Sequence, residues 1–274
     1  MTIGLLVPPI LITVFAWWFS TGLILLLLRL PRRIHLGVLV GFAGIALLGL
    51  WGLIISADHQ TPAGIYAGFC CTLLIWGWHE TSFLMGKVTG PRPKACPAGV
   101  KGWRRFGYAT ATLIYHEIAL FFTLIVIAAL TWQSANQIGL WIFSLLFAMR
   151  LSAKFNIFLG VPNLTEAFFP PHLEHLKSYL PKRMMNWLMP ISLLASAALI
   201  IWLWGALQQY APDSGQALAM TILITLACLG MLEHVFMITP LPDAALWRWA
   251  LPAQPAHAPL EPPQGVDVKK PESA

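Results

Sequence analysis

Long apolar stretches, separated by short polar connections, dominate the chain. Each stretch has roughly the 20 residues that an α-helix needs to cross the hydrocarbon core of a bilayer. The stretches lie at about 3–28, 36–57, 63–86, 107–131, 137–159, 187–209 and 216–240. This pattern predicts an all-α fold, a polytopic membrane helix bundle of about seven transmembrane helices. We expect the bundle to form one transmembrane domain over residues 1–251.

Two further segments are too polar to be spans. Residues 160–183 mix aromatic and charged side chains, and Pro170-Pro171 begins a stretch typical of a short helix lying on the cytoplasmic membrane interface. The tail over 252–274 is rich in Pro and Ala with scattered charges. Its composition predicts a disordered cytoplasmic tail.

The positive charges fall in every second connection. The connections near 58–62, 132–136 and 210–215 contain no Lys or Arg, while the alternate connections, the adjoining helix ends and the tail hold all 17 of them. Because basic loops stay in the cytoplasm, this asymmetry predicts a periplasmic N-terminus and a cytoplasmic C-terminus. We interpret the basic loops as topology signals and expect no nucleic acid partner.

Composition agrees with a protein embedded in the bilayer. Hydrophobic residues make up 58% of the 274 residues and charged residues only 10%, whereas soluble domains have about 25% charged residues. We therefore expect a multi-pass protein of the bacterial inner, or intracytoplasmic, membrane. The four cysteines include no C-x-x-C motif, and no P-loop or G-x-S-x-G motif occurs, so the sequence offers no sign of a disulfide framework or of nucleotide-driven chemistry.

Three adjacent His/Glu pairs interrupt the apolar stretches. They are His79-Glu80, His116-Glu117 and Glu233-His234. A central acidic residue costs roughly 2.5–3.5 kcal/mol on translocon insertion scales, so repeated pairs of the same two residue types point to a shared buried polar site. Counted at about 1.5 Å per residue from the predicted cytoplasmic helix ends, all three pairs lie about 10–15 Å deep, in one layer.

Polar and aromatic neighbours reach the same layer. Arg150 is expected to be the counter-ion of one of the carboxylates, and Asn156 lies near it on the same predicted helix. Trp78 precedes His79 and is a candidate for stacking on a planar ligand. Neighbouring helix positions differ by about 100°, so only one member of each pair can point to a common centre.

The residue types leave several chemistries open. Three carboxylates with three imidazoles match the ligand set of a di-iron or di-manganese centre, although soluble centres of that kind space Glu and His at i, i+3. A pigment or quinone pocket, proton-linked transport and a structural polar core are the other interpretations. As metal ligands the candidates are His79, Glu80, His116, Glu117, Glu233 and His234.

Several long motifs together resemble a known family. They are AWWFSTGLILLLLRLP, WGWHETSFLMGKVTGPR, RFGYATATLIYHEIAL, AKFNIFLGVPNL with PHLEHLKSYL, and LEHVFMITPLPDAALWRWAL. They cover most of residues 11–251 and resemble the photosynthetic complex assembly proteins of the PuhE type, from phototrophic proteobacteria. The resemblance carries no established catalytic residues.

The resemblance implies a role in building photosynthetic complexes. The expected function is a membrane factor for assembly of the reaction centre and core antenna and for bacteriochlorophyll supply. Its expected partners are reaction-centre or core-antenna subunits, pigment-synthesis proteins and the lipid bilayer. The alternative is a di-metal oxidoreductase of bacteriochlorophyll synthesis, such as an oxidative cyclase acting on a magnesium porphyrin. The cofactor is accordingly two Fe or Mn ions, or a bacteriochlorophyll or porphyrin.

Overall fold

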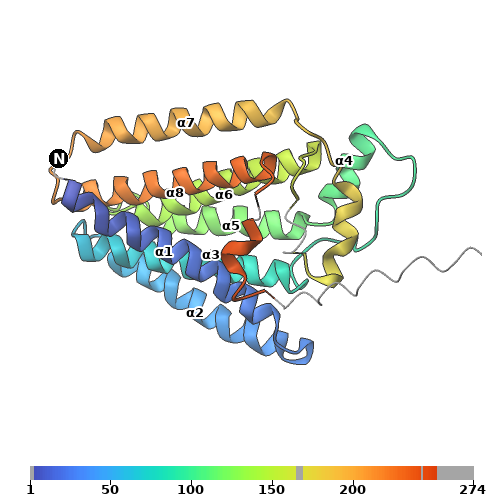
Figure 1. Cartoon of the computed structure of the whole chain (residues 1–274). Helices are drawn as coiled ribbons and strands as arrows, with labels where there is room; N and C mark the ends of the chain where they lie inside the picture. The colour runs from blue at the N-terminus through green and yellow to red at the C-terminus, as the bar shows by residue number, and fades with distance from the viewer. Residues whose placement is uncertain (1–2, 165–168, 242, 252–274) are drawn as a thin grey trace, which may run out of the picture.

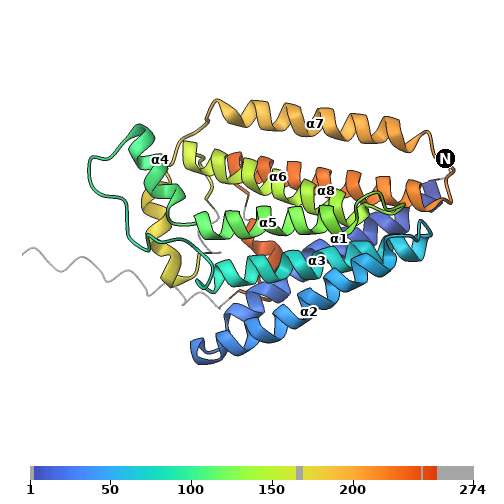
Figure 2. The ribbon, with the colours of Figure 1, turned by 180° about the vertical axis from the view of Figure 1, so that it is seen from behind.

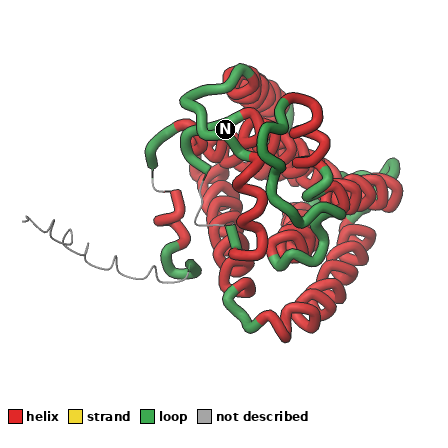
Figure 3. Tube along the Cα trace, turned by 90° about the vertical axis from the view of Figure 1, so that its right-hand side faces the viewer, coloured by secondary structure: helices red, strands yellow, loops and turns green. Residues whose placement is uncertain are grey.

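Long α-helices running side by side make up the computed structural model (Figure 1). It describes residues 3–164, 169–241 and 243–251, and over these residues Figure 3 shows helices and loops without any strand. The α-helices are α1 (Ile3–Leu28), α2 (His35–Ser56), α3 (Pro62–Leu84), α4 (Gly102–Thr110), α5 (Ile114–Leu130), α6 (Ile138–Leu159), α7 (Leu188–Leu207) and α8 (Gly215–Ile238). The 3₁₀ helices are η1 (Arg32–Ile34), η3 (Pro171–Tyr179) and η4 (Asp243–Trp247).

The predicted all-α membrane fold is confirmed. Over the described residues, five helices are long and apolar enough to cross a membrane, and a sixth span results if α4 and α5 count as one bent unit. Helix α3 has 23 residues, but its polar content keeps it outside that set, and the count of seven spans stays a prediction. A helix does follow Pro170 as expected, in 3₁₀ form. The predicted tail over 252–274 lies outside the described residues.

The predicted span over 107–131 is wrong in one respect. The chain there bends by 65° between α4 and α5, so the continuous helix begins only at Ile114. The preceding connection fills the break, because the backbone N–H of His116 donates to the Thr89 carbonyl and Arg92 N–H donates to the Ala111 carbonyl. Gly90 permits this approach, since a Cβ there would lie 2.3 Å from the Ala111 oxygen. His116 therefore lies in the first turn of α5, not ten residues inside a helix.

Helices α3, α6 and α8 form the inside of the bundle. Helix α6 packs against α3, α5, α7 and α8, and α8 packs against α1, α3, α6 and α7. Half of the most apolar window of α8 is buried, against 17% for α1 and α2. Figures 1 and 2 show α2 and α7 along opposite sides of the bundle. Outer helices thus present apolar side chains outward, as helices in a bilayer do.

The connections gather at two opposite ends of the bundle. At the end near the N-terminus, Asn136 donates to the carbonyls of Ser56, His59 and Gly64, which ties the α5–α6 connection to the α2–α3 connection. At the other end, η3 joins the α3–α4 connection through a bond from Tyr179 to the Lys94 carbonyl. This second end, which includes α4 and η3 in Figure 1, holds the basic connections and is called the basic end below.

Candidate functional site

Helix α6 carries the polar residues around which the candidate site is built. Arg150, Ser152, Lys154 and Asn156 follow one another at alternate positions near its basic end. Because residues two apart on a helix point about 200° apart, Arg150 and Lys154 share one face, and Ser152 and Asn156 share the opposite one. Helix α6 therefore presents a basic face to α3 and α5, and a neutral polar face to α7 and α8.

The basic face of α6 holds two glutamates. Arg150 Nη2 donates to Glu80 Oε2 at 2.7 Å, and Lys154 Nζ donates to Glu117 Oε1 at 2.5 Å. Glu80 comes from the penultimate turn of α3, and its side chain is only 7% exposed. A carboxylate in such surroundings needs a cation to offset its desolvation. Arg150 is thus the counter-ion that the sequence analysis expects.

The histidines of the same two pairs lie beside these ion pairs. His79 Nε2 is 2.9 Å from Thr123 Oγ1 on α5. The ring of His116 is 6.4 Å from the ring of His79 and 4.7 Å from the ring of Phe83, centroid to centroid. His116 is completely buried. Two predicted pairs, from α3 and α5, therefore meet against α6. Together with the two α6 cations they form what we call the ion-pair cluster: His79, Glu80, His116, Glu117, Arg150 and Lys154.

Several polar atoms of the ion-pair cluster are buried without a hydrogen-bond partner among the described residues. His116 is the extreme case, because neither of its ring nitrogens has a partner. The others are His79 Nδ1, Glu80 Oε1 and Glu117 Oε2. An unsatisfied buried polar group costs about 1–3 kcal/mol, so native proteins rarely gather several of them without a use. The cluster thus has spare hydrogen-bonding and ligating capacity in its interior.

The neutral face of α6 belongs to a second polar group, formed with α7 and α8. Ser152 Oγ lies 2.9 Å from Ser192 Oγ and 2.9 Å from His234 Nε2, and Asn156 Nδ2 donates to Ser192 Oγ at 2.9 Å. His234 Nδ1 faces the Gly230 carbonyl at 2.8 Å, which places the proton of a neutral imidazole on Nδ1. We call Ser152, Asn156, Ser192 and His234 the serine–histidine network.

Glu233 takes a third direction. Its Oε1 accepts a hydrogen bond from Trp17 Nε1 on α1 at 3.1 Å. The carboxylate lies within electrostatic range of Arg150, but Arg150 pairs with Glu80. The expectation that side chains of all three pairs converge on one centre thus holds for the pairs on α3 and α5, while the Glu233-His234 pair divides between α1 and α6. The physical reason is the 100° step between neighbouring helix positions.

Trp78 points away from the ion-pair cluster. Its Nε1 donates to the Leu39 carbonyl of α2 at 3.1 Å. Its ring meets the His79 ring edge-on at 5.0 Å, so it packs between α2 and α3. Asn156 is completely buried but belongs to the serine–histidine network and not to the ion-pair cluster. Of the three residues expected to contact a cofactor, only Arg150 lies in the cluster.

The ligand geometry of a metal centre is not present in the part of the chain that the structure describes. No group of three or more His, Cys, Asp or Glu side chains there is arranged to hold a metal ion. In the ion-pair cluster, Glu80 and Glu117 each bond a cationic side chain through one oxygen. A di-metal centre would therefore share both carboxylates with Arg150 and Lys154, and only the second oxygen of each is available without displacing them.

Three residues without a predicted role bond His or Glu residues of the predicted pairs or their partners: Ser192, Thr123 and Trp17. One signal exists for the serines, because small hydroxyl residues commonly line helix–helix contacts in membrane proteins. Nothing in the sequence pairs Trp17 with Glu233, which lie 216 positions apart.

Comparisons with known proteins place most of the chain in a family without an assigned function. The family described as "Protein of unknown function (DUF3623)" matches residues 4–258. A protein of Rhodobacter capsulatus, named "Uncharacterized 30.4 kDa protein in puhA 5'region", is 38% identical over 264 residues. That alignment covers 93% of this chain and 95% of the relative. No solved structure matches.

Proposed function

The chain belongs to the DUF3623 family of proteins of unknown function, and we propose that it is a membrane factor for the assembly of photosynthetic complexes. In this proposal the bundle supports assembly of the reaction centre and core antenna, and the supply of bacteriochlorophyll to them. The ion-pair cluster is its ligand-holding site. The protein acts within the inner membrane or its intracytoplasmic extensions.

One observation carries the proposal. A relative that is 38% identical across nearly the full length of both chains is encoded in the puhA 5′ region, which belongs to a photosynthesis gene cluster. Identity spread over 93% of this chain includes all the segments that build the ion-pair cluster. Proteins alike over that length share a fold, and a gene position beside photosynthesis genes favours a role in the same process.

The ion-pair cluster supplies the chemistry that such a factor needs. A pigment or a pigment precursor offers ring carbonyls, a central metal and carboxylate or ester groups, all of which imidazole nitrogens and cations can bind. His116, with two unpartnered ring nitrogens, is the residue that we assign to direct ligand contact. Arg150 and Lys154 balance the charge of the two glutamates, which offsets part of the cost of burying these carboxylates.

The outer face of α5 supports a membrane role with partner helices. Tyr115, Ile118, Phe121, Phe122 and Ile125 are each about half exposed or more. Side chains of this kind suit lipid tails and the apolar helices of partner subunits equally well. Because His116 and Glu117 lie on the same helix, a partner that docks on α5 would contact the helix that carries two of the six residues of the ion-pair cluster.

The test is genetic complementation in a phototrophic host. A strain that lacks the gene receives the wild-type protein or the variants Glu80→Gln, Glu117→Gln and His116→Leu, each at equal protein level in the membrane. Gln keeps the volume of Glu but removes the negative charge. We expect reaction-centre and core-antenna absorbance per cell to fall with each variant. An uncharged Gln no longer balances Arg150 or Lys154, and Leu removes the ring nitrogens of His116 that we assign to ligand contact.

The matched control is Glu174→Gln. Glu174 also pairs with a lysine, Lys177, but this pair lies on η3 with the Glu174 side chain 63% exposed. It should leave complex levels unchanged. Wild-type absorbance in all cluster variants would remove the cluster from the proposal, and wild-type absorbance in the strain that lacks the gene would overturn the proposal itself.

The di-metal oxidoreductase remains the alternative with its own measurement. It requires two Fe or Mn ions per chain in the purified protein and loss of that metal in Glu80→Gln. The ion pairs of Glu80 and Glu117 favour the assembly factor, because Arg150 and Lys154 already neutralise the carboxylate charge that a metal centre would need. Metal below one ion per two chains, together with co-purified bacteriochlorophyll, would support the assembly factor.

A further inference from the structure

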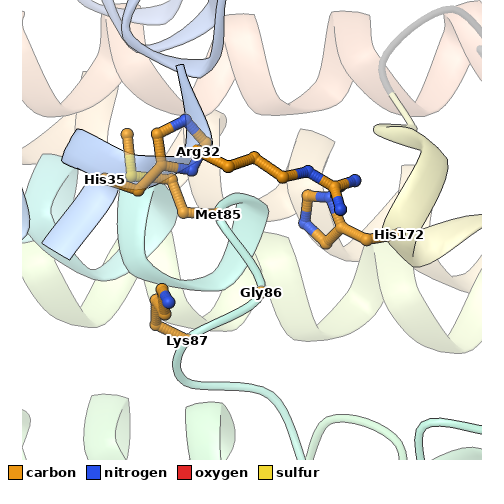
Figure 4. Close-up of a pocket in the computed structure, with 6 residues that line it drawn as sticks. All are labelled: Arg32, His35, Met85, Gly86, Lys87 and His172. Carbon is orange, nitrogen blue, oxygen red and sulfur yellow. Dashed lines mark hydrogen bonds between the residues drawn. The ribbon is translucent and has the colours of Figure 1, made fainter. Parts of the chain in front are cut away.

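A cavity of about 200 Å³ lies at the basic end of the bundle, away from both polar groups of α6. It is formed where three segments meet: the turn that leads into α2, the end of α3 and the start of η3. Figure 4 shows the Arg32 side chain running across Met85 toward the ring of His172. The cavity is lined by Arg32, His35, Met85, Gly86, Lys87 and His172.

The lining of this cavity is cationic and contains no carboxylate. Arg32 and Lys87 make no ion pair with any Asp or Glu of the part of the chain that the structure describes. Two unpaired cations beside one cavity repel each other, and an anion between them would remove that repulsion. Helix α2, which begins at His35, adds to this field, since its first turn has no acidic residue and no side-chain cap.

The two histidines are held in fixed positions around the cavity. His35 Nε2 faces the Leu30 carbonyl at 2.8 Å, and His172 Nε2 faces the Leu84 carbonyl at 2.8 Å. Each ring therefore carries its proton on Nε2, which leaves Nδ1 of His172 as an acceptor 3.5 Å from Arg32 Nη2. This contact sets the exposed Arg32 guanidinium beside the His172 ring at the cavity.

Gly86 allows η3 to close this side of the cavity. Its φ of +72° belongs to the left-handed region, and a Cβ there would lie 2.6 Å from His172 Cδ2. Met85, only 4% exposed, forms the apolar floor. The cavity thus combines two exposed cations with two hydrogen-bonded imidazoles and a buried apolar side chain.

An apolar track leads away from the cavity along α2. Leu36 and Val40, one and five residues after His35, are 63% and 65% exposed. Within the described ranges, the main contacts of helix α2 are with α3 and η1, and these leave the face with Leu36 and Val40 open. A ligand that has an anionic group in the cavity and acyl chains on this track would match both surfaces at once.

We propose that this cavity binds the phosphate of an anionic phospholipid headgroup, with Arg32 and Lys87 as its two cationic contacts. A free phosphate would satisfy the cations but leave the apolar track unused, which is why a lipid is the better match. Basic pockets between membrane helices are known to bind such headgroups. The bound lipid would join α2, α3 and η3 at the basic end. The proposal is independent of the function of the ion-pair cluster.

The test uses the full chain in detergent with three probes: phosphatidylglycerol, phosphatidylcholine and inorganic phosphate. Thermal unfolding is followed as each probe is titrated. We expect phosphatidylglycerol to raise the unfolding midpoint by several degrees, because a ligand that binds only the folded state stabilises it. We expect Arg32→Gln and Lys87→Gln each to weaken the apparent affinity about tenfold.

The matched control is Arg33→Gln. Arg33 has the same charge on the same 3₁₀ helix but does not line the cavity, and its affinity for phosphatidylglycerol should equal that of the wild type. Equal losses for Arg32→Gln and Arg33→Gln would show unspecific surface attraction and overturn the proposal, as would the absence of any midpoint shift. Equal protection by inorganic phosphate would overturn the lipid assignment, and equal protection by phosphatidylcholine would overturn the anion requirement.

Discussion

The ion-pair cluster and the serine–histidine network occupy opposite faces of the same turns of α6, yet they differ in charge and in how completely their polar atoms are hydrogen-bonded. The cluster joins two cations to two carboxylates and leaves both nitrogens of His116 without a partner among the residues that the structure describes. In the network, each nitrogen of His234 has a partner, and the hydroxyls of Ser152 and Ser192 bond each other. One group is charged and incompletely bonded, whereas the other is neutral and almost completely bonded.

The contrast separates two uses of buried polarity. A bonded neutral network fixes the packing of α6 against α7 and α8, and its cost in an apolar bundle is small. A charged group with unsatisfied atoms is expensive to keep, and its retention points to a ligand. Two His/Glu pairs that look alike in sequence, His116-Glu117 and Glu233-His234, therefore have different assignments: the first to ligand binding, the second to packing.

The largest expected effect is on the Glu80–Arg150 pair. Arg150→Gln should cost about 3 kcal/mol of stability, because it leaves a buried carboxylate without its counter-ion. The double variant Arg150→Gln with Glu80→Gln should be more stable than the sum of the two single losses predicts. Unfolding of the purified protein in detergent measures both effects. Strict additivity would show that the two side chains do not depend on each other.

A second expectation concerns His116. His116→Leu keeps a similar volume and removes two unpartnered nitrogens, so stability should rise by about 1 kcal/mol. At the same time complex levels in cells should fall, because the ligand contact is lost. Opposite signs for stability and function would mark a site kept for binding. A variant that is less stable but fully functional would assign His116 to packing and remove the contrast.

A smaller effect is expected on the other face of α6. Ser192→Ala removes the side-chain partner of Ser152 and Asn156 and should cost about 1 kcal/mol. Complex levels in cells should remain those of the wild type, since the network serves packing. The same unfolding and absorbance measurements apply. A loss of complexes at normal protein level would give the network a functional role, and the contrast between a binding cluster and a packing network would no longer hold.

The smallest effect concerns His172, which lies outside both groups and is accessible to titration. Burial lowers the pKa of His172 below its ordinary value of 6.5, the Leu84 carbonyl raises it, and Arg32, His35 and His175 lower it further. Lys87 lines the same cavity. Because the unfolded state takes up the proton more readily, this contribution to stability is constant above pH 6.5 and declines as the pH falls below it.

An NMR titration of His172 measures that pKa directly. The size of its shift shows how much neighbouring cations change the pKa of a partly exposed histidine, for comparison with the buried histidines of the two polar groups. We expect the unfolding midpoint of His172→Gln to decrease less than that of the wild type as the pH falls below 6.5. Above pH 6.5 the midpoints of the two proteins should change with pH in the same way. A pKa above that of a free histidine side chain would show that an acidic or anionic group dominates the site.

The helices could be predicted because each depends mainly on its own residues. Apolar stretches of about 20 residues need no partner to be recognised, and six of the seven predicted ranges agree with observed helices to within two residues. The depths of His79-Glu80 and Glu233-His234 were counted along such helices, whereas that of His116 was counted along 107–131, which is not one continuous helix. The exception, 107–131, fails because its break is stabilised from outside, by backbone bonds to residues 89–92 that are remote from any local pattern.

The sequence by itself therefore determined the all-helical membrane fold, the grouping of basic connections and the identity of the polar residues that interrupt the apolar stretches. Only the tertiary structure decided which of those polar residues meet. Helical periodicity states that Arg150 and Lys154 share a face, but the rotation of α6 relative to α3, α5, α7 and α8 decides what that face contacts. That rotation depends on packing between helices far apart in the chain, such as α1 and α8. There the hydrogen bond from Trp17 holds Glu233 away from the ion-pair cluster.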